Sequence, residues 1–196
     1  MFVIVGLGNP GNEYKTTRHN SGRILATLLA EKLEFPEFRN DTKANGEAAV
    51  GVIDSKKVTI LLPNTFMNKS GNAVSRYVKS VKAAKELMVV HDDIDLPFGT
   101  LRVSFGRGDG GHNGVASVMR ALKTKDFIRV RVGVSPKNAK GVAKKPSGEA
   151  HVLKFLLGKF TPAEQKELSG KLFKRFAELA ETAVSEGYVT AMNRFN

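Results

Sequence analysis

Four polar stretches of this sequence each follow an apolar run and carry residues that can do acid–base chemistry. They are "GLGNPGNEYKTTRHNSG", "PNTFMNKSGNA", "HDDIDLPFG" and "GRGDGGHNGV". Imidazole, with an ordinary pKa of about 6.5, exchanges a proton near neutral pH, and a carboxylate can orient it and raise its basicity. Asparagine offers donors and an acceptor without adding charge. If the stretches converge, His19, Asp92 and Asn9 could form one site.

Each of these residues also has an ordinary structural role open to it. His19 could simply begin a helix, and Asp92 or Asp93 could form a turn. Asn113 in "GGHNG" could cap a helix and do nothing more. If Asp92 and Asp93 lie in extended backbone, they point to opposite faces, so only one of them can orient a histidine.

The elements that must position these residues alternate between strand and helix. β-branched enrichment and turn residues predict strands at 2–6, 48–53, 57–63, 87–90, 100–105 and 127–134. Apolar spacing predicts helices near 20–34, 68–82, 114–124 and 151–157. It also predicts a long C-terminal helix. Thr161 caps this helix, Pro162 lies in its first turn, and Gly187 ends it in the left-handed conformation.

This order predicts an α/β fold: a single domain over residues 1–196, with a mixed twisted β-sheet covered by helices on both faces. The segment 48–63 reads as a hairpin within that sheet. Ligands of open α/β sheets bind at the carboxyl ends of strands. The polar stretches follow predicted strands, so we expect them to lie at such an edge.

Composition and net charge restrict the class of partner and the kinds of chemistry that this chain can have. The chain has 31 Lys and Arg against 19 Asp and Glu, and a net charge of +12. Residues 102–145 hold eleven Lys or Arg and two Asp, which favours a polyanion partner over a merely solvated basic face. The absence of cysteine excludes disulfides, thiolate nucleophiles and cysteine-ligated metal. No apolar run reaches the roughly 20 residues that span a membrane.

Gly6, Gly8 and Gly11 spell Gly-x-Gly-x-x-Gly directly after a strand, as a dinucleotide-binding turn does. Such a turn must open a helix whose N–H groups meet the pyrophosphate. Here Pro10 removes one donor, and "GNEYKTTR" intervenes before apolar helical spacing begins. We therefore predict no nucleotide cofactor. The glycines and Pro10 instead hold the side chain of Asn9 in a fixed position.

Seven stretches occur together in one order: "GLGNPGNEYKTTRHNSG", "LPNTFMNKSGNAV", "VVHDDIDLPFG", "GDGGHNGV", "RVRVGV", "LGKFTPAE" and "AMNRFN". In order and spacing they resemble the bacterial-type peptidyl-tRNA hydrolase family, and the resemblance covers nearly the whole chain. It implies an esterase without cofactor that cuts the ester between a peptide and the 3′ ribose of tRNA, recycling tRNA from stalled or aborted translation. We expect peptidyl-tRNA as the partner, no membrane association and a monomer.

The resemblance also implies roles for single residues. His19 would be the general base that activates water, Asp92 would hold and polarise its imidazole, and Asn9 would complete the catalytic set. The residues expected to bind the peptide and the 3′ end are Tyr14, Asn20, Phe66, Met67, Asn68, His112 and Asn113. No metal ligand is expected.

Contacts to tRNA phosphates are expected from Arg131, with Arg129 and Lys123 as helpers, because these cations cluster in sequence and neutralise phosphate without reading bases. The chain departs from the family pattern at two positions that matter here. Ser104 stands where some relatives carry a basic residue, and Phe66 stands where many have tyrosine. The second change keeps aromatic packing and loses a hydroxyl contact.

The sequence also has to be weighed against three alternative functions. A serine hydrolase is disfavoured because no Gly-x-Ser-x-Gly is present, and a metallohydrolase because the four histidines include no His-x-x-x-His pair. A non-catalytic RNA-binding module stays open, since the basic segment suits it without any chemistry. With no Arg-rich presequence before Met1, we expect a cytoplasmic protein, or a mitochondrial one if the source is eukaryotic.

Overall fold

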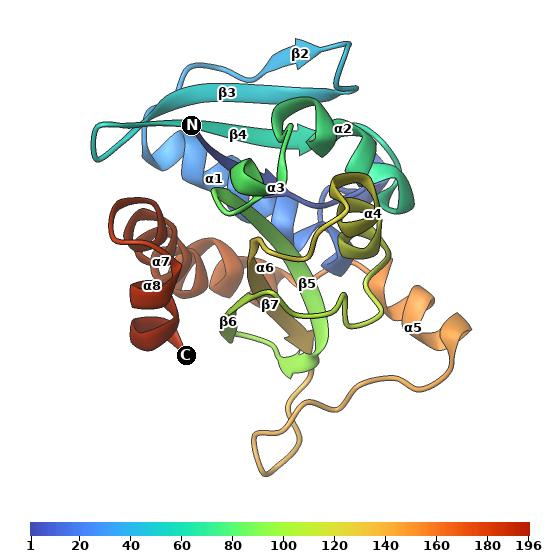
Figure 1. Ribbon diagram of the computed structural model, residues 1–196. Helices are drawn as coiled ribbons and strands as arrows, with labels where there is room; N and C mark the ends of the chain where they lie inside the picture. The colour runs from blue at the N-terminus through green and yellow to red at the C-terminus, as the bar shows by residue number, and fades with distance from the viewer.

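Seven strands form one mixed sheet in the computed structural model, which describes residues 1–196, and their order is β2-β3-β4-β1-β5-β7-β6 (Figure 1). The strands are β1 (Phe2–Gly6), β2 (Arg39–Asp41), β3 (Gly46–Ile53), β4 (Lys56–Pro63), β5 (Leu87–Pro97), β6 (Leu101–Phe105) and β7 (Ile128–Ser135). The strands β4, β1, β5 and β7 are parallel, and the antiparallel β3–β4 pair is the predicted hairpin. Every residue of β1 is buried, as expected for a central parallel strand covered on both faces.

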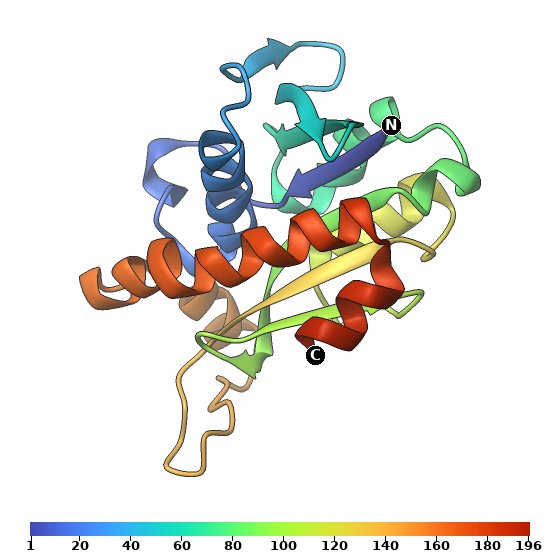
Figure 2. The same cartoon turned by 90° about the vertical axis from the view of Figure 1, so that its left-hand side faces the viewer.

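Helices pack on both faces of this sheet (Figure 2). They are α1 (Ser21–Lys32), α2 (Ser70–Tyr77), α3 (Val81–Ala84), α4 (Asn113–Leu122), α5 (Glu149–Leu156), α6 (Pro162–Glu167), α7 (Phe173–Ser185) and α8 (Tyr188–Phe195). Short turns of helix are η1 (Asn12–Tyr14), η2 (Arg18–Asn20), η3 (Met67–Lys69) and the π-helical η4 (Leu168–Leu172). One apolar cluster joins the sheet to α1 and α7, and a second joins it to α2 and α4. The predicted α/β fold is confirmed. None of the helices combines the length and the hydropathy needed to span a bilayer.

The C-terminal helical region differs in part from its prediction. The cap at Thr161 is confirmed: its Oγ1 accepts from the N–H of Glu164, and the Glu164 carboxylate accepts from the N–H of Thr161. The single long helix is interrupted by η4 and ends at Ser185. Gly187 has φ 91° and ψ 166°, which is not the left-handed helical conformation, and it precedes α8, which the sequence analysis missed.

Two other boundaries are wrong for reasons of pairing and capping. The strand predicted to end at residue 90 continues to Pro97, because β5 keeps pairing with β7 beyond Asp93 through a register shift. The helix predicted over 68–82 ends at Tyr77, because Val78 is extended, and Ser80 caps the separate α3. The short edge strand β2 was not predicted.

Close packing of α1 against β1 and β5 places the segment before this helix beside the strand ends. A Cβ on Gly22 would lie 2.1 Å from the carbonyl oxygen of Val90, and a Cβ on Gly6 would lie 2.6 Å from the Cβ of Ala26. The N–H of Leu7 donates to the same Val90 oxygen at 3.0 Å. Only glycine permits this approach. His19, which lies in η2 two residues before α1, is thereby brought to the part of β5 that carries Asp92.

Candidate active site

Asp92 lies where side chains from three separate elements meet. It is on β5 and 2% exposed, His19 comes from η2, and His112 precedes α4. The Asp92 Oδ1 atom is 2.9 Å from Nδ1 of His19 and 3.0 Å from Nε2 of His112. The two imidazole centroids are 5.2 Å apart. The expected contact between His19 and Asp92 is present, and His112 joins the same carboxylate.

The hydrogen bonds of His112 define its tautomer. Its Nδ1 accepts from the N–H groups of Gly114 at 3.1 Å and Val115 at 3.2 Å, so this ring caps α4. Because Nδ1 accepts, the proton must be on Nε2, which donates to Asp92. Both ring nitrogens are therefore engaged. Asn113 is the exposed first residue of the helix, and the cap that its side chain could have supplied comes from His112.

His19 has the opposite arrangement, with one nitrogen free. A carboxylate only accepts, so Nδ1 of His19 carries a proton and donates it to Asp92. Its Nε2 has no partner within the chain and is not enclosed. Burial disfavours the charged imidazole, but the charge of Asp92 and its hydrogen bond outweigh burial and raise the pKa of His19.

Asp92 stays ionised in this environment. Burial alone would raise the pKa of its carboxyl group, yet the charges and hydrogen bonds of His19 and His112 hold that pKa well below its usual range. An ionised Asp92 can stabilise a positive charge that forms on His19. The arrangement provides an oriented base with a fixed counter-charge and a free lone pair.

The turn after β1 immobilises Asn9. The N–H of Asn9 donates to Oδ1 of Asn20, and its carbonyl accepts from Nδ2 of Asn20, each at 2.9 Å. The side-chain Oδ1 of Asn9 accepts from the N–H of Met67 at 2.9 Å, which leaves its Nδ2 as a donor without a partner in the chain. A Cβ on Gly8 would lie 2.9 Å from Cγ of Asn20. Asn20 was expected to bind substrate, and its amide is used to hold Asn9.

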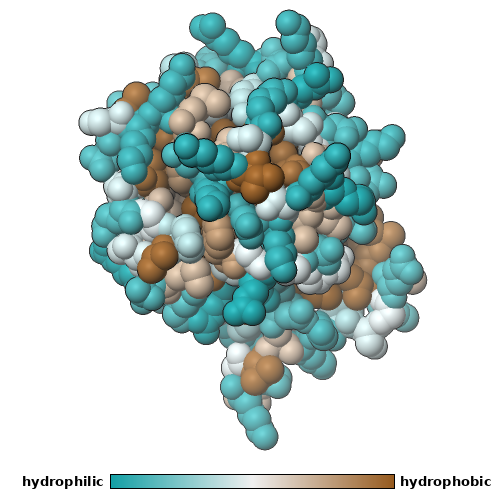
Figure 3. Space-filling model, viewed as in Figure 1, coloured by the Kyte–Doolittle hydropathy of each residue, from teal (hydrophilic) through white to brown (hydrophobic).

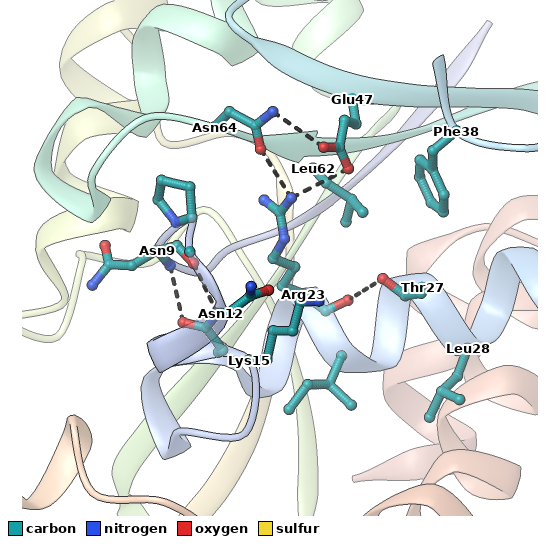
Figure 4. Close-up of a pocket in the computed structure, with 14 residues that line it drawn as sticks. Asn9, Asn12, Lys15, Arg23, Thr27, Leu28, Phe38, Glu47, Leu62 and Asn64 are labelled. Atoms are coloured by element: carbon teal, nitrogen blue, oxygen red, sulfur yellow. Dashed lines mark hydrogen bonds and ion pairs between the residues drawn. The ribbon is translucent and has the colours of Figure 1, made fainter. Parts of the chain in front are cut away.

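A cavity of about 770 Å³ lies behind this turn, and Figure 4 shows the Asn9 side chain pointing away from it. Arg23 fills its floor. This guanidinium donates to the carbonyl of Pro63 at 2.7 Å and to Oδ1 of Asn64 at 2.9 Å, and it pairs with Glu47 at 3.4 Å. Its charge is thus neutralised inside the protein. The cavity shares Asn9 and Asn20 with the site, and His19, Asp92 and His112 do not line it.

The other predicted substrate residues lie at different depths. Met67 is buried, and its Sδ lies 2.5 Å from where a Cβ on Gly114 would be, so it packs beneath the site and reaches it only through its N–H. Tyr14 is half-buried in η1. η3 packs against α4. Three of the predicted substrate residues lie in η3, in α4 or directly before η3 and have exposed side chains: Phe66, Asn68 and Asn113.

The predicted phosphate contacts are on β7 and at the end of α4. Nε of Arg131 donates to Oδ2 of Asp93 at 2.6 Å, so Asp93 and Asp92 do point to opposite faces of β5. Arg129 is 5% exposed, and burial and the neighbouring charge of Arg131 lower its pKa. It faces Ser104 across the β6–β7 pair, and the Ser104 hydroxyl has no partner in the chain. Lys123 is exposed at the end of α4.

His91 also belongs to the site, although its sequence position did not predict this. This residue is 2% exposed, its Nδ1 donates to the carbonyl oxygen of Asp92 at 2.7 Å, and its ring packs edge-on against His112 with centroids 4.7 Å apart. Burial, with the nearby His112 and Arg129, lowers its pKa well below the ordinary value. Strand alternation directs His91 and Asp92 to opposite faces, so the "HDD" pattern gave no sign of this contact.

His19, Asp92 and His112 also have the composition of a metal site, since one ligand atom from each lies within 4.8 Å of the others. Nε2 of His112 would need a free lone pair to bind a metal. Its proton would then move to Nδ1, which already accepts from two backbone N–H groups. The observed hydrogen bonds therefore suit two donors that orient a carboxylate, and they do not suit a cation.

Known proteins match this chain over nearly its whole length. A family model described as "Peptidyl-tRNA hydrolase" matches residues 3–196. The chain is 39% identical over 197 residues to a peptidyl-tRNA hydrolase of Syntrophotalea carbinolica, covering 100% of this chain and 97% of that protein. It is 40% identical over 198 residues to that of Chloroflexus aggregans, covering 100% and 99%. The crystal structure of peptidyl-tRNA hydrolase from Acinetobacter baumannii superposes with a TM-score of 0.87 at 34% identity, covering 100% of this chain and 94% of that one.

Proposed function

The chain belongs to the peptidyl-tRNA hydrolase family of carboxylic ester hydrolases, and we propose that His19 is the general base with which it cuts the ester between a peptide and the 3′ ribose of tRNA. The observation that carries the proposal is the shared carboxylate. Two imidazoles donate to Oδ1 of Asp92, and of these two only His19 keeps a free nitrogen.

The proposed reaction begins with water held by Nε2 of His19. The water oxygen bonds to the ester carbonyl carbon while one of its protons passes to Nε2, and the imidazolium that forms is stabilised by ionised Asp92. The negative charge moves to the carbonyl oxygen. Nδ2 of Asn9, which has no partner in the chain and belongs to an immobilised amide, would donate to that oxygen.

Collapse of this intermediate breaks the bond to the ribose 3′ oxygen. That oxygen takes the proton back from Nε2 of His19, so the products are a peptide acid and tRNA with a free 3′ hydroxyl. His112 does not exchange protons in this scheme, because both of its ring nitrogens are engaged. It holds Asp92 from the second side and thereby fixes the direction from which the carboxylate meets His19.

Binding of tRNA is proposed for the basic face of β7 and α4. Arg131 would meet phosphate directly, since its side chain is 30% exposed, and Arg129 beneath it would add positive charge. Lys123 would extend this face. Phe66, Asn68 and Asn113 present exposed side chains for the peptide and the 3′ end. Such activity recycles tRNA in the compartment of translation, which we take to be the cytoplasm, or the mitochondrion in a eukaryotic source, and needs only a monomer.

Hydrolysis of N-acetyl-aminoacyl-tRNA in the presence of a metal chelator tests the proposal. We expect release of the N-blocked amino acid and slow cleavage of the same tRNA with a free amine, because the natural substrate carries a peptide bond at that nitrogen. Tight tRNA binding without ester cleavage would instead support the non-catalytic RNA-binding alternative. Loss of cleavage on chelation would contradict a base made only of protein groups.

A further inference from the structure

A second polar pocket, which the proposed reaction does not use, lies on the loop that leads into η3. Its volume is about 380 Å³, and it lies between the β2–β3 turn, Thr65 and the outer side of α2. The side chains that matter for its chemistry are Lys43, Asn45, Thr65, Asn72, Arg76 and Lys79. Hydrophilic side chains dominate the surface over this corner of the molecule (Figure 3).

The pocket has an excess of positive charge. Lys43, Arg76 and Lys79 make no salt bridge in the structure, and no acid lines the pocket. Asp41 is the acid next to it. Its carboxylate accepts from the hydroxyl of Tyr77 at 2.7 Å and from the N–H of Ala44 at 3.0 Å, so it braces the turn. Of the three pocket cations, Lys43 is the one whose charge acts on Asp41.

A buried hydroxyl in the same pocket lacks a partner. Thr65 is 8% exposed, lines the pocket, and its Oγ1 has no hydrogen-bond partner in the chain. Buried hydroxyls are normally satisfied, so an unpartnered one indicates a missing hydrogen-bond partner. The amides of Asn45 and Asn72 add further donors. A pocket rich in donors and cations, with no carboxylate, has the chemistry of an oxyanion site.

The position of the pocket relative to the catalytic residues indicates which oxyanion it meets. Thr65 is two residues before Met67, whose N–H is held by Asn9, and the exposed Phe66 lies between them. In the sheet the order is β4-β1-β5-β7. The pocket lies beyond the end of β4, the catalytic side chains follow β1 or lie on β5, and Arg131 is on β7. The ester-cutting site is therefore between two separate cationic sites.

We propose that this pocket binds a backbone phosphate of the single-stranded 3′ end of the RNA, on the side of the catalytic centre opposite to Arg131. The inference rests on the proposed function, because it is the ester at the 3′ ribose that brings this strand past Phe66. A phosphodiester supplies a hydrogen-bond partner for the Thr65 hydroxyl and a negative charge for Arg76 and Lys79, which have none. The RNA strand is held through its phosphate backbone, so the pocket does not read the base sequence.

The test compares two double variants by their salt dependence. Arg76→Gln with Lys79→Gln removes two cations of the pocket, and Lys82→Gln with Lys85→Gln removes two cations of α3 and the residue after it, outside the pocket. The slope of log affinity for deacylated tRNA against log salt should flatten by about 0.7 per lost cation in the first variant, as for single strands. It should stay unchanged in the control. An unchanged slope in both variants overturns the inference.

A shortened RNA locates the contact. With tRNA that lacks its three 3′ nucleotides, the Arg76/Lys79 variant and the wild type should show the same slope. A difference that persists on the shortened RNA overturns the assignment to the 3′ strand. Inorganic phosphate is the second probe. If it shifts the Thr65 amide resonance while the slope for full-length tRNA is unaffected by the variant, the site takes a small anion and the RNA assignment is wrong.

A matched change at Thr65 separates binding from folding. Thr65→Val keeps the shape and removes the hydroxyl, and we expect a several-fold weaker affinity for full-length tRNA with a melting temperature that is unchanged or higher. An equal affinity overturns the role given to Oγ1. Failure of the proposed function is distinguishable, because a wild-type protein that does not cleave N-acetyl-aminoacyl-tRNA contradicts it whatever the salt slopes are.

Discussion

Replacement of Asp92 by asparagine tests the central electrostatic claim with almost no change of shape. The carboxylate is buried and accepts from Nδ1 of His19 at 2.9 Å. Two unit charges about 4 Å apart attract by about 4 kcal/mol at an effective dielectric constant near 20. The amide in the variant keeps an acceptor but loses this attraction to the imidazolium. We expect kcat to fall by about 100-fold to 1,000-fold, with KM changed less than about threefold.

We also expect the pH dependence of kcat/KM to change in Asp92→Asn. Asp92 raises the pKa of His19 against the effect of burial. The base is active only when neutral, so the acid limb of kcat/KM follows this pKa. Without the carboxylate, burial dominates and the pKa falls. The residual activity should therefore have its acid limb at lower pH than in the wild type.

Asp93→Asn is the matched control, because Asp93 is adjacent and faces the other way, toward Arg131. Single-turnover cleavage of N-acetyl-aminoacyl-tRNA at saturating enzyme should be close to normal in this variant. The assay is single-turnover hydrolysis over a range of pH for all three proteins. Equal losses at both positions, or an Asp92→Asn variant that keeps more than half of its activity, would refute the reasoning.

The remaining predictions use the same assay and equilibrium measurements. His19→Ala should lower turnover at least about 100-fold and leave tRNA affinity nearly unchanged, and substantial activity would exclude His19 as the base. His112→Asn should keep the α4 cap and therefore most of the free energy of unfolding, whereas His112→Ala should lower that free energy by about 0.5–2 kcal/mol, measured by chemical denaturation. Both variants should cleave the ester slowly. Arg131→Ala should flatten the slope of log tRNA affinity against log salt by somewhat less than one unit, while cleavage at saturating substrate stays normal. An unchanged slope would mean that other residues contact the tRNA phosphates. Because the folded pKa of Asp92 is depressed, its contribution to stability is present above about pH 3.8 and is lost at lower pH, so wild type and Asp92→Asn should converge in free energy of unfolding in acid.

Local chemistry in the sequence was enough for much of the fold. The apolar run at 2–6, the hairpin at 48–63 and the cap at Thr161 depend on residues that are near one another in the chain, and the structure has all three. The opposite orientation of Asp92 and Asp93 also followed from strand geometry alone. The fixing of Asn9 by its glycine–proline turn is of the same kind, although its partner Asn20 was not foreseen.

Elements that depend on distant partners were given wrong boundaries or were not predicted. The extension of β5 to Pro97 exists because β7 supplies hydrogen bonds to it. β2 is a three-residue edge strand that is defined by its pairing with β3, and α8 packs beside β6 and α7. Propensity within a short window cannot contain this information, because the stabilising contacts come from residues far away in sequence.

Composition and motif order are enough to list the groups available for chemistry: an imidazole, a carboxylate, amides and a basic segment, with no thiol. What each of these groups can do depends on the contacts that the folded chain gives it. Asp92 could have met either histidine, and only the approach of α1 and α4 to β5 gives it both. The backbone N–H groups that begin α4 fix the proton of His112 on Nε2, which leaves the free lone pair to His19. The physical reason is that a proton's position depends on all the hydrogen-bond partners of a ring, and here those partners come from three separate parts of the chain.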